Sequence, residues 1–156
     1  MNGAGRASAG VALLAALGVL TGCGDAGDDK EVVPTLAVRA GGDEITADAT
    51  QYCLDGDGQR FQTSAPIIEV APDTTIELTV SEAVAAAGWS VQVFDEELQQ
   101  ILGEVDVPAG ESTFSEITSS DVAPPTFYLV VVETADPDAC SGLSGAWPVG
   151  FIRAGG

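Results

Sequence analysis

The most site-like arrangement of residues in the sequence is C-L-D-G-D-G at positions 53–58. Carboxylates two residues apart, followed by glycine, begin many calcium loops because alternate side chains can converge on one cation. Continued through a twelve-residue calcium frame, however, the chain has Arg60 at the glycine position and Pro66 at the position of the bidentate acid. A tight turn built from Asp and Gly explains the same residues. We therefore predict a turn, with Asp55 and Asp57 only as weak candidates for a metal site.

Groups suited to catalysis are scarce. The sequence contains no histidine, which removes the usual general base, the Ser/His and Cys/His nucleophile pairs and the commonest metal ligand. Its single methionine is Met1, so a thioether copper site is not expected. Ser141 and Ser144 lie in a glycine-rich loop with no histidine to activate them, and Asp136 and Asp138 flank a proline in a predicted turn. Since no spacing singles out a carboxylate pair for glycoside hydrolysis, we predict no catalytic residue and no cofactor.

Two of the three cysteines, Cys53 and Cys140, are predicted to form a disulfide. An even number of cysteines in an exported domain favours a bridge. The bridge would close a loop across a separation of 87 residues, which the chain-entropy model values at about 4 to 5 kcal/mol, less any strain. The alternative is two separate buried thiols. A catalytic cysteine would have no base beside it, and a zinc site would lack ligands.

The third cysteine, Cys23, lies in a segment that resembles the bacterial lipobox. Residues 11–20 form an apolar run as long as the core of a signal peptide and too short to cross a bilayer. The run ends in L-T-G-C, in which two small residues suit the signal peptidase and the cysteine thiol accepts a diacylglyceryl group. We predict that residues 1–22 are a lipoprotein signal peptide and that Cys23 carries the lipid. The alternatives are a secretory signal with ordinary cleavage and an uncleaved anchor.

Lipidation at Cys23 predicts that the chain is held by its acyl chains on the outer face of the cytoplasmic membrane. Residues 23–34 are acidic and polar, so we expect a flexible tether, and residues 35–156 suffice for one domain. Removing residues 1–22 takes away one of five basic residues and none of the 24 acidic ones, which leaves a formal charge of −20. Such a charge repels nucleic acid, so no nucleic-acid partner is expected.

Apolar side chains alternate along the domain as they do in β-strands. Strict alternation occupies residues 75–80, 89–93 and 147–151. Residues 127–132 are continuously apolar, which is typical of a central strand covered on both faces. Trp89 and Trp147 lie on apolar strand faces, so core packing is expected rather than a ligand groove. Weaker strand candidates are residues 36–39, 45–50, 67–70, 98–105 and 112–117.

One segment has the features of a short helix. Residues 81–88 begin with a capping serine, place an acid in the first turn and end in glycine. Turn residues separate the predicted strands at short intervals. Many short strands and one connecting helix predict an all-β, immunoglobulin-like β-sandwich.

Three segments carry a family resemblance: Y-C-L-D at 52–55, I-E-L-T-V-S at 76–81 and A-A-A-G-W-S-V-Q-V-F-D at 85–95. Together they resemble an actinobacterial family of small lipoproteins and extracytoplasmic proteins with an Ig-like domain of unknown function. The likeness covers most of the chain after Pro34. It implies an immunoglobulin-like extracytoplasmic domain and supplies no activity. The chain departs from its relatives in one respect, because they tend to have a second cysteine shortly after the one at position 53.

These observations favour a lipid-anchored module that binds an envelope protein or glycan and does not catalyse a reaction. Two other functions stay open. One is an enzyme that uses carboxylates on cell-wall or glycan substrates, and the other is a calcium-dependent adhesion or assembly module.

Overall fold

The computed structural model describes residues 32–122 and 124–155. The predicted signal peptide, Cys23 and most of the predicted tether lie outside the described residues. None of the helices in the described part of the chain is long and apolar enough to cross a bilayer.

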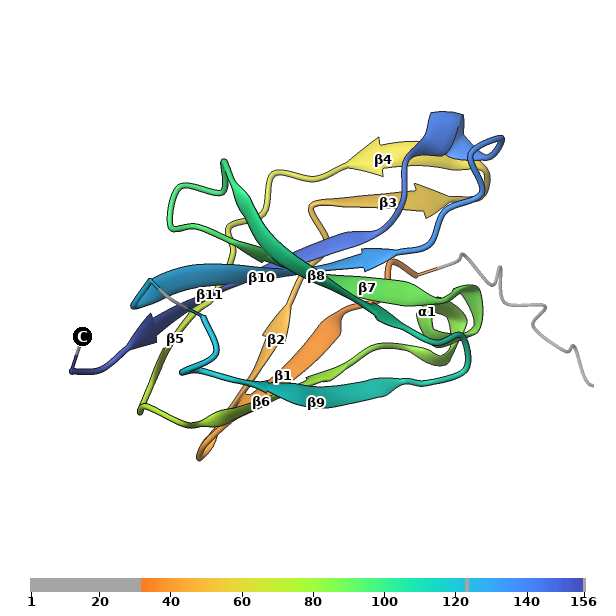
Figure 1. The fold of residues 1–156 in the computed structure, drawn as a ribbon. Coiled ribbons are helices and arrows are strands. Elements are labelled where there is room, and N and C mark those ends of the chain that lie inside the picture. The colour runs from red at the N-terminus through yellow and green to blue at the C-terminus, as the bar shows by residue number, and fades with distance from the viewer. Residues whose placement is uncertain (1–31, 123, 156) are drawn as a thin grey trace, which may run out of the picture. The chain divides into compact units, whose positions relative to one another are not determined.

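Two sheets pack face to face as a β-sandwich (Figure 1). The smaller has the order β2 (Asp43–Ala47), β1 (Leu36–Ala40), β6 (Thr75–Thr79) and β9 (Thr113–Thr118). The larger has the order β4 (Asp57–Arg60), β3 (Gln51–Leu54), β11 (Ala146–Arg153), β10 (Thr126–Glu133), β7 (Trp89–Phe94) and β8 (Ile101–Val107). A further strand, β5 (Ile67–Val70), pairs with β11 in parallel, while all other pairs are antiparallel. The predicted immunoglobulin-like all-β class is confirmed.

The core lies between the sheets and consists of the inward side chains of alternating strands. Ile76 and Leu78 on β6 are fully buried, as the alternation predicts. Trp89 and Trp147 are each 1% exposed, which confirms their predicted place in the core. The buried N–H group of each indole also forms a hydrogen bond. Nε1 of Trp89 donates to the carbonyl of Glu111 at 2.7 Å, and Nε1 of Trp147 donates to the carbonyl of Pro34, before β1, at 2.8 Å.

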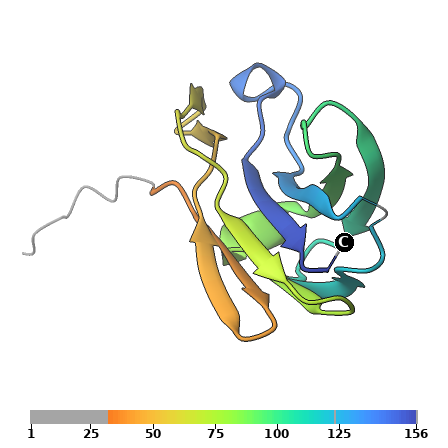
Figure 2. The same cartoon turned by 90° about the vertical axis from the view of Figure 1, so that its left-hand side faces the viewer.

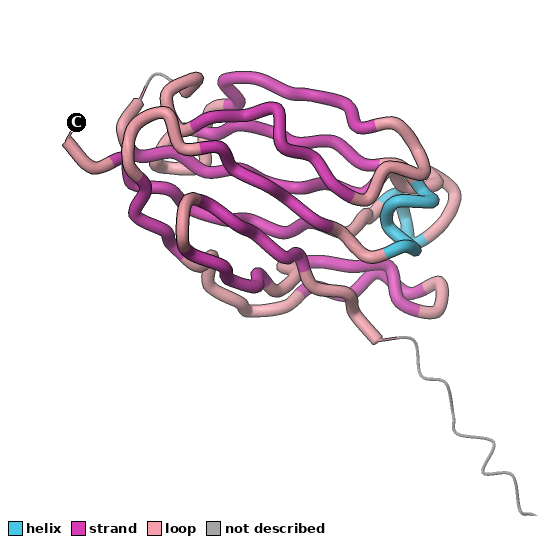
Figure 3. Tube along the Cα trace, turned by 90° about the horizontal axis from the view of Figure 1, so that it is seen from below, coloured by secondary structure: helices cyan, strands magenta, loops and turns pink. Residues whose placement is uncertain are grey.

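The predicted helix is present as α1 (Glu82–Ala87), which connects β6 of one sheet to β7 of the other at one end of the sandwich (Figure 3). Its Ser81 hydroxyl accepts a hydrogen bond from the amide of Val84. Gly88 takes a φ of 87° and donates its amide to the carbonyls of Val84 and Ala85. The chain therefore begins and ends this helix with the residues that the sequence indicated.

The continuously apolar segment 127–132 was predicted to be covered on both faces, and this is wrong. It forms central strand β10, but only Phe127, Leu129 and Val131 are buried, and the alternate residues are half-buried. The strand with both faces covered is β11, in which every residue from Ala146 to Phe151 is buried. Small residues achieve this, since a side chain at Gly150 would collide with the ring of Tyr128.

Two further segments differ from the sequence prediction. The hairpin β3–β4 was not predicted as strands, because its residues are mostly polar and do not alternate. Strand β8 was predicted to begin at position 98 but begins at Ile101. The reason is a turn in which the Asp95 carboxylate accepts the amides of Gln99 and Gln100 at 2.8 and 3.2 Å, while Leu98 takes a φ of 55°. In the smaller sheet, the β1–β2 hairpin forms the edge opposite β9 (Figure 2).

Candidate functional site

The D-G-D-G segment forms the two-residue turn between β3 and β4. Asp55 and Gly56 both have positive φ, 50° and 80°, as the favoured hairpin turn requires. The predicted turn is therefore confirmed. The Asp57 carboxylate accepts a hydrogen bond from Nε2 of Gln59 at 2.7 Å. Within the described ranges, no group of three or more His, Cys, Asp or Glu side chains could hold a metal ion.

Cys53 and Cys140 form a disulfide, as predicted, with their Cα atoms 5.7 Å apart. The bridge joins β3 to the 3-10 turn η1 (Cys140–Gly142), which precedes β11. Gly58 on β4 permits this approach, since a Cβ there would lie 3.2 Å from the Cys140 carbonyl oxygen. The disulfide therefore fixes the β3–β4 hairpin against the segment that leads into the most buried strand.

The other candidates from the sequence have structural roles in the same region. Asp136 accepts the amide of Asp138 at 2.9 Å, which is the turn predicted there. The Ser144 carbonyl accepts Nε2 of Gln51 at 3.0 Å. The structure brings Asp57, Cys140 and Ser141 to one polar depression of about 380 Å³. The two cysteines are joined to each other, so neither offers a free thiol in this depression.

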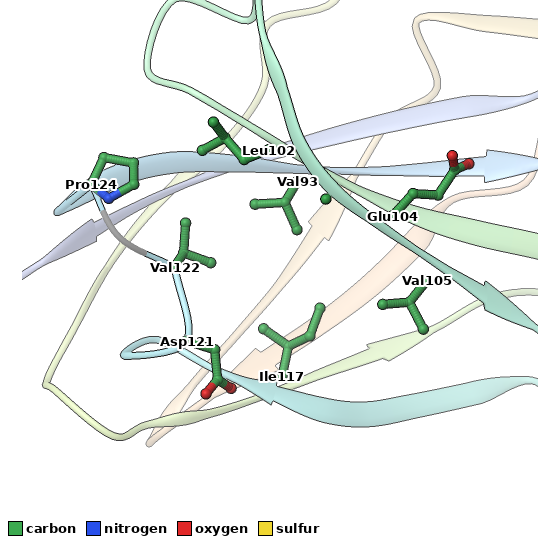
Figure 4. A pocket seen from close by; sticks show the side chains of 9 residues that line it. Val93, Leu102, Glu104, Val105, Ile117, Asp121, Val122 and Pro124 are labelled. Carbon is green, nitrogen blue, oxygen red and sulfur yellow. The ribbon is translucent and has the colours of Figure 1, made fainter.

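A different surface, which the sequence did not indicate, has the form of a binding site. It is an apolar groove of about 480 Å³ between β8 and β9, called the β8–β9 groove below (Figure 4). Its lining consists of Val93, Leu102, Gly103, Glu104, Val105, Ile117, Asp121, Val122 and Pro124. The side chains of Leu102 and Val105 are 44% and 38% exposed, so the groove presents apolar surface to solvent. Apolar concave surfaces with a few polar groups are the usual form of binding sites.

The register of β8 explains why the groove has this lining. Val93 pairs with Gly103, whereas Phe94 pairs with Ile101, so Leu102 is the extra residue of a β-bulge. A bulge re-aims a side chain. Here consecutive residues, Leu102 and Gly103, both line the groove.

Two residues of the lining, Glu104 and Asp121, carry carboxylates, and that of Glu104 is directed to the outer face of β8 (Figure 4). The Glu104 carboxylate accepts hydrogen bonds from Gln92 and Ser90, each at 3.0 Å, on the outer side of β8, and these bonds lower its pKa. The Asp121 carboxylate accepts the backbone amide of Thr118 at 2.6 Å, which lowers its pKa as well. Both groups are therefore negatively charged at neutral pH. No basic residue is among those that line the groove.

No protein-family model, no curated protein and no solved structure matches this chain.

The residues of the groove gave only weak signals in the sequence. The segment 98–105 was a weak strand candidate, and its adjacent apolar residues Ile101 and Leu102 break the alternation. Such a break is the local sign of a bulge. That the strand lies at the end of a sheet depends on long-range pairing, which local pattern does not encode.

Proposed function

We propose that this chain is a lipid-anchored, extracytoplasmic binding module that engages an envelope protein or glycan through the β8–β9 groove. The anchor is the acylated Cys23, and its membrane contact is the lipid. The observation that carries the binding role is the exposed apolar lining of the groove between two sheet edges, with Leu102 and Val105 open to solvent. Contiguous exposed apolar surface rimmed by polar residues is typical of interaction sites.

The electrostatics of the groove favour binding over glycan hydrolysis. A glycosidase needs one carboxyl group that stays protonated and acts as the general acid, so its pKa must be raised. The pKa values of Glu104 and Asp121 are instead lowered by the hydrogen bonds that they accept. These two carboxylates are suited to attract a cation and unsuited to donate a proton.

The anchor is tested by Cys23→Ala in the native cell. We expect metabolic labelling with a palmitate analogue to be lost and the protein to be uncleaved or released from the membrane. Two acyl chains hold a small domain stably on a membrane, at about 0.8 kcal/mol per buried CH2, so the difference in fractionation should be clear. Unchanged labelling and detergent-dependent membrane association would contradict the anchor.

The groove is tested by photo-crosslinking in the intact envelope. A photo-reactive amino acid replaces Leu102 in the groove or, as the control, the exposed Thr46 on β2. We expect a discrete crosslinked product from position 102 that is absent from position 46. Gly103→Leu should abolish it, because a Cβ at Gly103 meets nothing within 4 Å and the added side chain would occupy the groove. Equal products from both positions, or a product that persists in Gly103→Leu, would rule out the groove as the binding surface.

A further inference from the structure

Two sheet edges face the β8–β9 groove. β8 ends the larger sheet and pairs only with β7, while β9 ends the smaller sheet and pairs only with β6, among the residues described. Every second residue of an edge strand directs its N–H and C=O groups away from its partner strand. Such an edge can pair with a strand supplied by another chain.

β8 is only partly protected as an edge. Edge strands are commonly shielded by charged side chains, bulges, proline or short length, and of these β8 has the bulge at Leu102 and two acids on its outer face. β8 has seven residues, and Ile101, Leu102 and Val105 are 52%, 44% and 38% exposed. Its acids Glu104 and Asp106 are exposed too, and Glu104 lies on the face opposite the apolar lining (Figure 4). The edge is therefore apolar toward the groove and acidic on the other side.

Gly103 lies in the middle of this edge and lines the groove. Its φ is not in the left-handed region, and a Cβ would meet nothing within 4 Å, so neither backbone conformation nor crowding requires glycine there. Glycine inside a strand weakens the strand and often marks a bulge, such as the one at the adjacent Leu102, or a place where another backbone approaches closely. The open space beside Gly103 is suited to the main chain of a partner.

The charges around the groove select the kind of partner. Asp121 borders it, Glu116 is exposed on β9, and the whole chain carries a formal charge of −19, while Glu104 and Asp106 add negative charge on the outer face of β8. Of the arginines in the described ranges, Arg39 forms ion pairs with two glutamates in the smaller sheet, and none lines the groove. A second copy of this acidic chain would be repelled at such an edge, and a basic segment would be attracted.

We infer that the β8–β9 groove receives an extended, basic polypeptide segment that adds as a strand to the edge of β8 and buries alternate apolar side chains between β8 and β9. This inference rests on the proposed binding role of the groove and specifies its partner. A segment matching the seven residues of β8 would extend over roughly 24 Å. Main-chain hydrogen bonds would supply affinity, while the apolar lining and the acidic border would select its side chains.

The test titrates the full lipoprotein in detergent with a synthetic peptide in which valine and threonine alternate between pairs of terminal lysines. We expect saturable binding that weakens with salt and is about tenfold weaker or more for the same peptide with terminal glutamates. Two further peptides carry N-methyl groups on the backbone nitrogens of one edge or the other. At least one should bind about tenfold more weakly, since it has lost the donors that pair with β8. Binding should also slow hydrogen exchange of β8 amides.

The groove variants are Gly103→Leu and Leu102→Asn, and the matched control is Gly42→Leu. Gly42 lies in the β1–β2 turn on the far edge of the smaller sheet, and a Cβ there also meets nothing within 4 Å. Both groove variants should weaken peptide binding about tenfold or more, and the control should bind like the unaltered chain. A circular dichroism melt checks that each variant is folded.

Other outcomes overturn the inference in distinguishable ways. Suppose that position 102 gives the crosslink and that Gly103→Leu abolishes it. If then no lysine peptide binds, or if neither methylated peptide binds more weakly, the groove binds something other than a basic strand. Competition by oleate with no effect of methylation would identify an acyl chain as the occupant. A concentration-dependent dimer that Gly103→Leu dissociates would identify a second copy. If the crosslink is also insensitive to Gly103→Leu, the proposed function fails together with the inference.

Discussion

Trp147 on the last strand donates its indole N–H to the carbonyl of Pro34, 113 residues earlier in the chain, across 2.8 Å. Val33, just before Pro34, packs against the core. The final strand thus holds the segment through which the chain enters the domain. Packing therefore extends to Val33, which lies inside the segment predicted as tether.

We expect Trp147→Phe to lower the free energy of unfolding by about 1–3 kcal/mol, because it removes buried ring volume and the hydrogen bond to Pro34. The matched control is Trp89→Phe, which loses a similar bond to Glu111. Urea unfolding should show comparable losses. Only Trp147→Phe should speed hydrogen exchange around residues 33–36, and equal exchange in both variants would show that the indole of Trp147 does not hold this segment.

Replacing both bridging cysteines, Cys53→Ala with Cys140→Ala, should reduce stability by up to about 4 to 5 kcal/mol. The reason is that the bridge spans 87 residues and restricts the unfolded chain strongly. Urea unfolding of the unaltered and altered chains measures the difference, and reduction of the unaltered chain should reproduce it. Thiol titration of exported, denatured protein without reductant should detect neither cysteine. Two titratable thiols would mean that the bridge does not form in the cell.

Asp55→Asn with Asp57→Asn should change stability by no more than about 0.5 kcal/mol, since asparagine keeps the turn chemistry and two negative charges are removed. In melts at constant ionic strength, millimolar calcium and magnesium should give the same midpoint. A calcium site at a hundred times its Kd would add about 2.7 kcal/mol. A rise selective for calcium that disappears in the double variant would establish a metal site in the β3–β4 turn.

The decrease in the free energy of unfolding at acidic pH should depend on Asp121. Its pKa is lowered in the folded chain by the amide of Thr118, so the unfolded chain binds more protons as pH falls through the ordinary aspartate range, about 3.9. The stabilisation is therefore present above that range and is lost below it. Asp121→Asn should flatten this slope while keeping an acceptor for Thr118, whereas Asp121→Ala should flatten it and also lower the melting temperature at neutral pH. Unfolding from pH 7 to pH 2 measures both, and unchanged slopes would contradict this role.

Local residue patterns were enough to predict which faces of most strands are buried and where the helix and several turns lie. These features depend on neighbouring residues: Ile76 and Leu78 alternate with polar residues, Ser81 and Gly88 cap α1, and Asp55-Gly56 suits a turn with two positive φ values. The cysteine pairing followed from counting the two cysteines left after the predicted lipid site at Cys23.

Which strands are covered on both faces and which lie exposed at an edge became clear from the folded chain alone. β11 is buried on both faces because other segments cover its small residues, and the apolar segment of β10 is half-buried because its outer face is not covered in the same way. β8 is open because the sheet stops there, which no residue within β8 specifies. Edge position arises from pairings between segments far apart in the chain, whereas alternation records only which side of a strand is apolar. For that reason the sequence indicated the core and the disulfide, and the β8–β9 groove became visible only in the folded sandwich.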